Sequence, residues 1–297
     1  MQRSGFSVFL NNTSKRSGLK VWAVAGALIG LTACSTLPEP TGQLSGYGNL
    51  DKSKGVVARY KTFANHDGLA EYKRIHIRPV VITASAAAKA GDANLNLVSN
   101  AIARDMCNAL AGYYQIVDQA GADSLELAAF VTDFSPTSAK ASAASSAIGF
   151  FSPVSRLPIG LGLLSAEAEV LSPDGQQLAS LVWSRKANLL DTGGLSQISD
   201  AYAFSGGFSS AFVKVLKPVK SPVKSNLSAA PKPGSKAFEQ QKAVNGAACK
   251  VYGEGPGVKG FLNRFSPLGA PPEWIDKGRA TKPQPDQEPA KAKAAPK

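Results

Sequence analysis

An apolar run of eleven residues, 21–31, lies near the start of the chain and is followed three residues later by Cys34. The residues before it include four Lys or Arg and no acid. As a helix, eleven residues span about 16 Å, roughly half of a bilayer's hydrocarbon core, so a permanent transmembrane helix is disfavoured. A basic stretch, a short apolar run and small residues are typical of a secretory signal. We therefore predict that residues 1–33 are a signal peptide and that the mature protein folds outside the cytoplasm.

The signal ends in Leu31-Thr32-Ala33-Cys34, which resembles the lipobox of bacterial lipoproteins. This resemblance implies diacylglycerol on the sulfur of Cys34, cleavage before Cys34 and acylation of the freed amine. Two or more acyl chains hold a protein durably on a membrane, whereas one chain is a marginal anchor. Ser35 follows the cysteine, and lipoproteins without Asp there usually go to the outer membrane. We expect a lipid anchor in the outer membrane with the domain facing the periplasm; an ordinary secretory signal is the alternative.

Charge and proline divide the mature chain into two parts. Residues 34–216 hold 14 Lys and Arg against 15 Asp and Glu, whereas residues 217–297 hold 15 basic residues, 6 acidic residues and 12 of the 19 prolines. We therefore predict a disordered basic tail at 217–297. Residues 247–279 are more apolar, so we expect them to dock on the domain or to form a short partner motif, with Trp274 as the candidate partner anchor.

Residues 34–68 are rich in Gly, Pro, Ser and Lys and predict a tether before a domain at 69–216. A flexible tether of some 25 residues has an r.m.s. span of roughly 25–30 Å. Cys107 and Cys249 remain as thiols after Cys34 is modified, and they can pair in an oxidising compartment. Cys107 lies within an apolar helical pattern, however, which favours a buried free thiol.

Hydrophobic periodicity predicts the elements of the domain. Alternating or apolar runs predict strands near 72–82, 114–117, 124–134, 166–171 and 177–183, and apolar residues at helical spacing predict helices at 95–110 and 199–216. Ser172-Pro-Asp-Gly175 predicts the turn of a hairpin between the last two strands. These elements predict an α+β fold, namely a two-layer sandwich of about five mostly antiparallel strands with the helices on one face.

The domain is similar to the bacterial lipoproteins of the DUF3313 family. The residues that carry this resemblance are 45–50, 72–80, 114–118, 166–170 and the turn at 174–175. Together they cover roughly residues 45–216. The resemblance implies an envelope lipoprotein of unknown activity and supplies no active site.

The sequence lacks the usual marks of hydrolytic, redox or nucleotide chemistry. His66 and His76 are its two histidines, and neither belongs to a zinc motif; Cys-x-x-Cys, Gly-x-Ser-x-Gly and P-loop patterns are also missing. The Gly255–Gly260 stretch matches Gly-x-Gly-x-x-Gly by letters, but Pro256 removes an amide and no βαβ unit surrounds it. We therefore predict no catalytic, cofactor or metal site.

Glu167 and Glu169 lie two apart on one predicted strand, so their side chains point to the same face. Ala166, Ala168 and Val170 occupy the other face. Paired carboxylates can serve acid–base chemistry, but a solvated outer face is the interpretation that we favour.

These observations favour a non-enzymatic binding or assembly module on a lipid anchor. Its expected partners are the membrane, envelope proteins and, for the basic tail, anionic envelope polymers; a periplasmic protein has no nucleic acid to bind. One alternative is an accessory lipoprotein for envelope lipid or polymer transport, with an apolar groove near residues 148–164. The other is an envelope hydrolase with an unrecognised site.

Overall fold

The structure is a computed structural model that describes residues 38–138, 160–188, 191, 194–217, 232–256 and 270–278. Its strands are β1 (Ala58–Ala64), β2 (Arg74–Ile77), β3 (Val81–Ile82), β4 (Gln115–Val117), β5 (Ser124–Ser135), β6 (Leu163–Leu171) and β7 (Gln177–Lys186). Its helices are α2 (His66–Ala70), α3 (Ala84–Ala90), α4 (Leu95–Leu110), α6 (Ser199–Leu216), α7 (Lys236–Gly246), the 3-10 helix η2 (Ala248–Tyr252) and α9 (Pro272–Ile275).

The strands form one mixed sheet of seven strands, and the α+β class is confirmed. Its order is β1-β7-β6-β5-β2-β4, with β3 paired to β5. The pairs from β1 to β5 along this order are antiparallel, whereas β2 is parallel to both β4 and β5, and β3 is parallel to β5. The four longest strands, β1, β5, β6 and β7, thus pair antiparallel as expected, and the parallel pairings involve the short strands β2, β3 and β4. Helix α4 connects β2 to β4, and a helical crossover between neighbouring strands makes them parallel.

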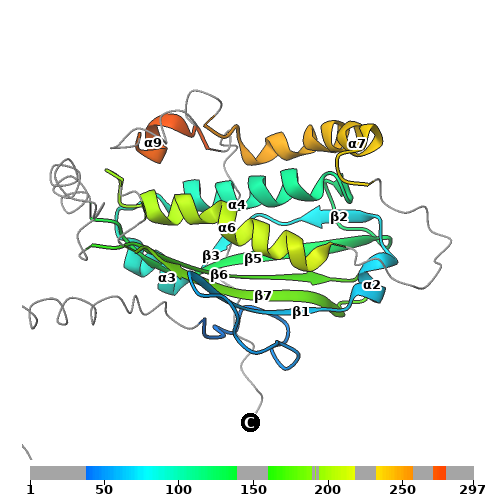
Figure 1. Cartoon of the computed structure of the whole chain (residues 1–297), viewed down its shortest axis with the longest axis horizontal. Coiled ribbons are helices and arrows are strands. Elements are labelled where there is room, and N and C mark those ends of the chain that lie inside the picture. The colour runs from blue at the N-terminus through cyan, green and yellow to red at the C-terminus, as the bar shows by residue number, and fades with distance from the viewer. Residues whose placement is uncertain are drawn as a thin grey trace, which may run out of the picture. The chain divides into compact units, whose positions relative to one another are not determined.

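Both long helices lie on one face of the sheet, as predicted (Figure 1). On α4, Val98, Ile102 and Met106 are fully buried at i, i+4 spacing, and Asn94 is the N-cap residue. The ring of Phe208 from α6 lies 5.8 Å from that of Trp183 from β7, centroid to centroid. This contact joins the helical layer to the sheet.

Strand β1 and the residues before it correct the predicted tether. Ala58–Ala64 pairs along its whole length with β7, so the sheet begins inside the segment expected to be a tether at 34–68. The strand was missed because it alternates small or aromatic residues with Arg59 and Lys61, which blends into the Lys-rich stretch before it. Such charges are common on edge strands, where they discourage pairing of the open backbone edge with another chain.

The predicted disordered tail is wrong for α7, whereas the described parts of 247–279 dock on the domain, which was one of the two expectations for them. Within 217–297, residues 232–256 and 270–278 include α7, η2 and α9, which pack on the side of α4 away from the sheet (Figure 1). The sandwich therefore has a third layer, and α4 is covered on two sides. The rest of this predicted tail lies outside the described residues.

A disulfide joins this third layer to α4, contrary to the expected free thiol. The Sγ atoms of Cys107 and Cys249 are 2.03 Å apart and the residues are 142 positions apart in the chain. Cys107 is fully buried as predicted, but the layer that buries it comes from η2. The apolar pattern of α4 could not distinguish burial against the sheet from burial against a distant segment.

Candidate functional site

The predicted anchor lies outside the described residues. This applies to Cys34 and to the lipobox residues Leu31, Thr32 and Ala33. Most of the proposed apolar groove at 148–164 and of the glycine-rich stretch at 255–260 also lies outside them. Trp274, the candidate partner anchor, is described.

Glu167 and Glu169 are buried, so the predicted solvated face was wrong. A segment at residues 41–47, which we call the N-terminal segment, covers their face of the sheet opposite α4 and α6 (Figure 1). Glu167 is 0 % exposed and accepts hydrogen bonds from the Thr41 N–H at 2.8 Å and the Tyr47 hydroxyl at 2.6 Å. Buried carboxylates require such donors to offset their lost hydration.

The neighbouring carboxylate of Glu169 binds the middle of the N-terminal segment. Its Oε2 accepts hydrogen bonds from the backbone N–H of Ser45 at 2.9 Å, the Ser45 hydroxyl at 2.6 Å and the Gln177 side-chain amide at 2.8 Å. Gln177 also donates to the carbonyl of Gly46 at 3.1 Å. The predicted pair of carboxylates therefore holds the start of the described chain, and its acceptor sites are used for structure.

The contact with Glu167 changes the acidity of Tyr47. Burial, followed by the hydrogen bond and negative charge of Glu167, raises the pKa of the Tyr47 phenol above its ordinary value of 10.0. The hydroxyl therefore remains a donor at neutral pH. It also accepts the backbone N–H of Leu44 at 3.0 Å, which fixes the turn of the N-terminal segment.

A buried ion pair holds residues 270–278, the C-terminal segment, on the helical layer. Arg104 Nη2 of α4 donates to Asp276 Oδ2 at 2.7 Å, and the Asp276 side chain is 0 % exposed. The Tyr202 hydroxyl of α6 also donates to Asp276, and the N–H of Gly278 donates to its other oxygen at 2.8 Å. The carboxylate is thus satisfied by donors from two helices and from its own segment.

Burial and charge shift the pKa values of this cluster. Burial lowers the pKa of Arg104, but the hydrogen bond and charge of Asp276 outweigh it and leave that pKa above its ordinary value. Burial, and then the hydrogen bond to Asp276, raise the pKa of Tyr202. The Tyr202 phenol is therefore neutral at neutral pH, and the Arg104 guanidinium keeps its charge.

The indole of Trp274 is exposed to solvent, although residues on both sides of it are buried against the domain. Trp274 is 80 % exposed in α9, whereas Pro272 and Asp276 on either side are buried. The Ser196 hydroxyl donates to Glu273 at 2.6 Å, which adds a second contact between this segment and the domain. The structure therefore presents an aromatic side chain on a segment with a defined position.

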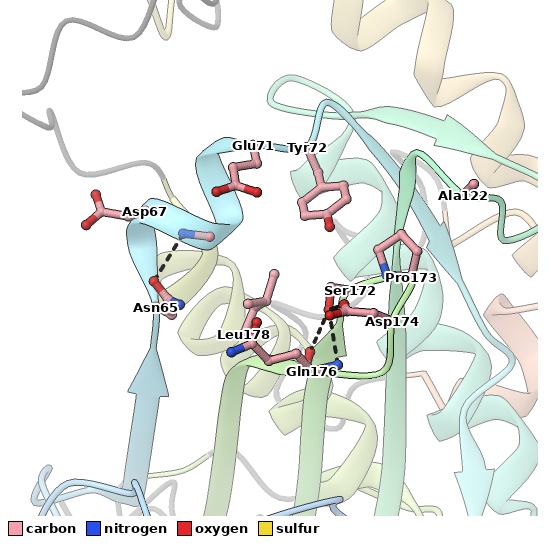
Figure 2. Close-up of a pocket in the computed structure, with 11 residues that line it drawn as sticks. Asn65, Asp67, Glu71, Tyr72, Ala122, Ser172, Pro173, Asp174, Gln176 and Leu178 are labelled. Carbon is pink, nitrogen blue, oxygen red and sulfur yellow. Dashed lines mark hydrogen bonds between the residues drawn. The ribbon is translucent and has the colours of Figure 1, made fainter.

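A polar pocket of about 500 Å³ lies between α2 and the β6–β7 turn (Figure 2). Tyr72 points its hydroxyl toward Ser172 in the turn, and Glu71 and Asp174 place carboxylates at the rim, whereas Asp67 points away. The Ser172 hydroxyl contacts Asp174 and accepts the N–H of Gln176 at 3.1 Å, so it is engaged in the turn. The hydrogen bond that the Ser172 hydroxyl donates to Asp174 lowers the pKa of this carboxylate.

Neither histidine enters this pocket. His66 is the first residue of α2, where a loop was expected, and it is not among the pocket-lining residues. His76 lies on β2, as predicted, with Nδ1 3.2 Å from the carbonyl of Val117. Among the residues with a described position, no group of three or more His, Cys, Asp or Glu is arranged to hold a metal ion.

Sequence reasoning singled out Trp274 as a candidate and placed Glu167 and Glu169 on one face, but it missed the groups that position them. Arg104 follows Leu97 and Ala101 at i, i+4, i+7 spacing, and all three are buried. This second buried stripe on α4 was the available signal for a layer on its outer side. An arginine in such a stripe requires a buried acid, and Asp276 is that acid.

Together these features define a single α+β domain on a mixed sheet, with segments from both ends of the chain bound to its two sides. The chain belongs to the family described as "Protein of unknown function (DUF3313)", whose model matches residues 39–212. No curated protein matches the sequence. Among solved structures, a PelC dodecamer from Paraburkholderia phytofirmans is 14% identical with a TM-score of 0.31, and the match covers 56% of this chain and 99% of that one. No helix in the described ranges is long and apolar enough to cross a membrane.

Proposed function

We propose that this protein is a lipid-anchored cell-envelope protein whose α+β domain is a non-enzymatic binding or assembly module. The signal at 1–33 and the lipobox ending in Cys34 support an acylated N-terminus in the outer membrane, with the domain in the periplasm. A binding role is supported by an exposed aromatic side chain on a segment whose position is fixed by the domain.

The exposed indole of Trp274 is the observation that carries the binding role. Tryptophan is enriched among the residues that contribute most to protein interfaces. An anchor held in position before binding loses less conformational entropy when a partner arrives. The buried ion pair between Arg104 and Asp276 supplies that fixed position, two residues away from the indole.

The pocket gives less support to the hydrolase alternative. The Ser172 hydroxyl donates to Asp174 within the hairpin turn, and this hydrogen bond lowers the pKa of that carboxylate. Asp174 is therefore a weak base for activating a serine nucleophile. The partner that we propose for Trp274 is an envelope protein. The net charge of +9 over residues 217–297 suits a weaker, salt-sensitive contact with anionic envelope polymers.

Photo-crosslinking in cells tests this proposal. A crosslinkable residue at the exposed Lys277 should capture an envelope protein, and Trp274→Ala should weaken that contact by about thirtyfold, as expected for an interface residue worth about 2 kcal/mol. Val244→Ala is the matched control because Val244 is an apolar side chain that is 75 % exposed on α7. Mass spectrometry of the adduct identifies the partner.

An adduct that survives Trp274→Ala, or one lost equally with Val244→Ala, would contradict the assigned anchor. Cys34→Ala tests the lipid anchor separately. This variant should leave the membrane fraction, and an unmodified N-terminus in intact-mass analysis of the parent would contradict lipidation.

A further inference from the structure

We propose that the loop at residues 51–57, together with strand β1, contacts the surface of the membrane that holds the lipid anchor. This inference rests on the proposed lipidation of Cys34. Its starting point is a pair of apolar side chains at the tip of the loop, because Val56 is 87 % exposed and Val57 is 53 % exposed.

The length of chain between the anchor and the domain is short. Thr41 is already bound to Glu167, and it lies seven residues after Cys34. Seven residues span at most about 24 Å when fully extended. A domain of this size is roughly 40 Å across. The sheet face that binds the N-terminal segment is therefore held near the membrane.

Strand register places basic side chains on this same face. Lys61 is opposite Val182 on β7, and Val182 is opposite Glu167 on β6, so the three residues share one face. Arg59 lies on this face as well, two residues from Lys61 on β1. Tyr60, between them, packs against the core on the helical side.

Charge in this region favours an anionic surface. Residues 51–61 contain four Lys or Arg and a single acid, Asp51, which gives a net charge of +3. Lys54 pairs with Asp51 at 2.6 Å, and Lys52 is exposed beside it. Apolar side chains flanked by basic ones are typical of segments that rest in the interface of an anionic bilayer.

The loop has a defined conformation that projects the two valines. Lys54 and Tyr60 exchange backbone hydrogen bonds of 2.8 and 3.0 Å, which close the base of the loop. Gly55 adopts a φ of +86°, and a Cβ there would lie 2.0 Å from the carbonyl oxygen of Ala58. Glycine is therefore required at the turn that presents Val56.

Fluorescence quenching in reconstituted vesicles tests the contact. The full lipid-modified protein is placed in vesicles of brominated phosphatidylcholine and phosphatidylglycerol, with a tryptophan added by Val56→Trp. The bromine atoms should quench this added tryptophan. Val244→Trp is the matched control, because Val244 is similarly exposed but belongs to α7 in the layer beyond α4.

We expect quenching for Val56→Trp and little for Val244→Trp. Adding Lys52→Gln and Lys61→Gln should reduce the quenching, because each lysine near an anionic surface contributes about a fivefold gain in membrane affinity. High salt, or vesicles without phosphatidylglycerol, should also reduce the quenching. Equal quenching at both positions, or none at position 56 in protein that floats with the vesicles, would overturn the inference. Protein that does not float with the vesicles would overturn the lipid anchor itself.

Discussion

The two bound segments of this domain use different chemistry on opposite sides of the molecule. The N-terminal segment, 41–47, lies on the sheet and is held by hydrogen bonds to Glu167 and Glu169. The C-terminal residues 232–256 and 270–278 lie on the helical layer and are held by a disulfide and a buried ion pair. The first attachment is reversible and depends on a set of donors, whereas the second is partly covalent.

The two attachments differ in where they lie relative to the family match. It covers residues 39–212, so the N-terminal segment lies inside it and both C-terminal stretches lie outside. Both partners of the attachment by two glutamates therefore lie within the matched range. The disulfide and the pair formed by Arg104 and Asp276 join additional sequence to it, and that sequence carries Trp274.

Of the changes considered, substitution of Asp276 should cause the largest loss in the free energy of unfolding. Asp276→Ala leaves Arg104 buried without its acid, which typically costs about 3–5 kcal/mol. Urea unfolding should show a loss of about 3 kcal/mol, because release of residues 270–278 lets water reach the guanidinium. The double variant Arg104→Met, Asp276→Ala should recover much of this loss, and no recovery would contradict a role for the unpaired charge.

Sequence patterns predicted the parts of the fold whose signals are local. Helices α4 and α6 matched their predicted bounds because apolar residues recur at helical spacing over four or more turns. The β6–β7 hairpin followed from Pro-Asp-Gly, where Gly175 has a φ of +83°. In each case the residues that determine the element lie within it.

The candidate surfaces could not be predicted in this way because their partners are distant in sequence. Glu167 is 126 residues from Thr41, and Arg104 is 172 residues from Asp276. A pattern within one strand shows which side chains share a face, but not what covers that face. This is why Glu167 was placed in solvent although its face was identified correctly.

Alkaline pH should destabilise the helical side through Tyr114. Burial raises the pKa of its phenol from 10.0 to about 12, and Asn245 of α7 donates to its backbone carbonyl at 2.8 Å. The unfolded chain loses this proton at lower pH than the folded chain does. The contribution to stability is therefore complete below pH 10 and falls by about 1.4 kcal/mol per pH unit, or about 2.7 kcal/mol by pH 12.

Urea unfolding at neutral pH and at alkaline pH measures this loss. In Tyr114→Phe, the decrease in the free energy of unfolding between pH 10 and pH 12 should be smaller by about 2.7 kcal/mol. The variant's own stability at neutral pH is the reference, since it includes the lost hydrogen bond to the carbonyl of Leu216. Equal alkaline losses in the parent and the variant would show that the buried phenol does not control this response.

The smallest expected loss of stability concerns the N-terminal segment. Tyr47→Phe removes a hydrogen bond of 2.6 Å to the buried Glu167. Hydrogen bonds to charged groups contribute about 1.5–3 kcal/mol, and we expect the lower end of this range because Thr41 still donates to the same carboxylate. Hydrogen exchange should quicken at the N–H groups of Thr41 and Ser45 while exchange in α4 is unchanged. Tyr72→Phe is the matched control, since this hydroxyl lies in the pocket rather than under the segment. If α4 exchanged faster together with the N-terminal segment, the two attachments would be coupled through the sheet, and the comparison of two independent attachments would be wrong.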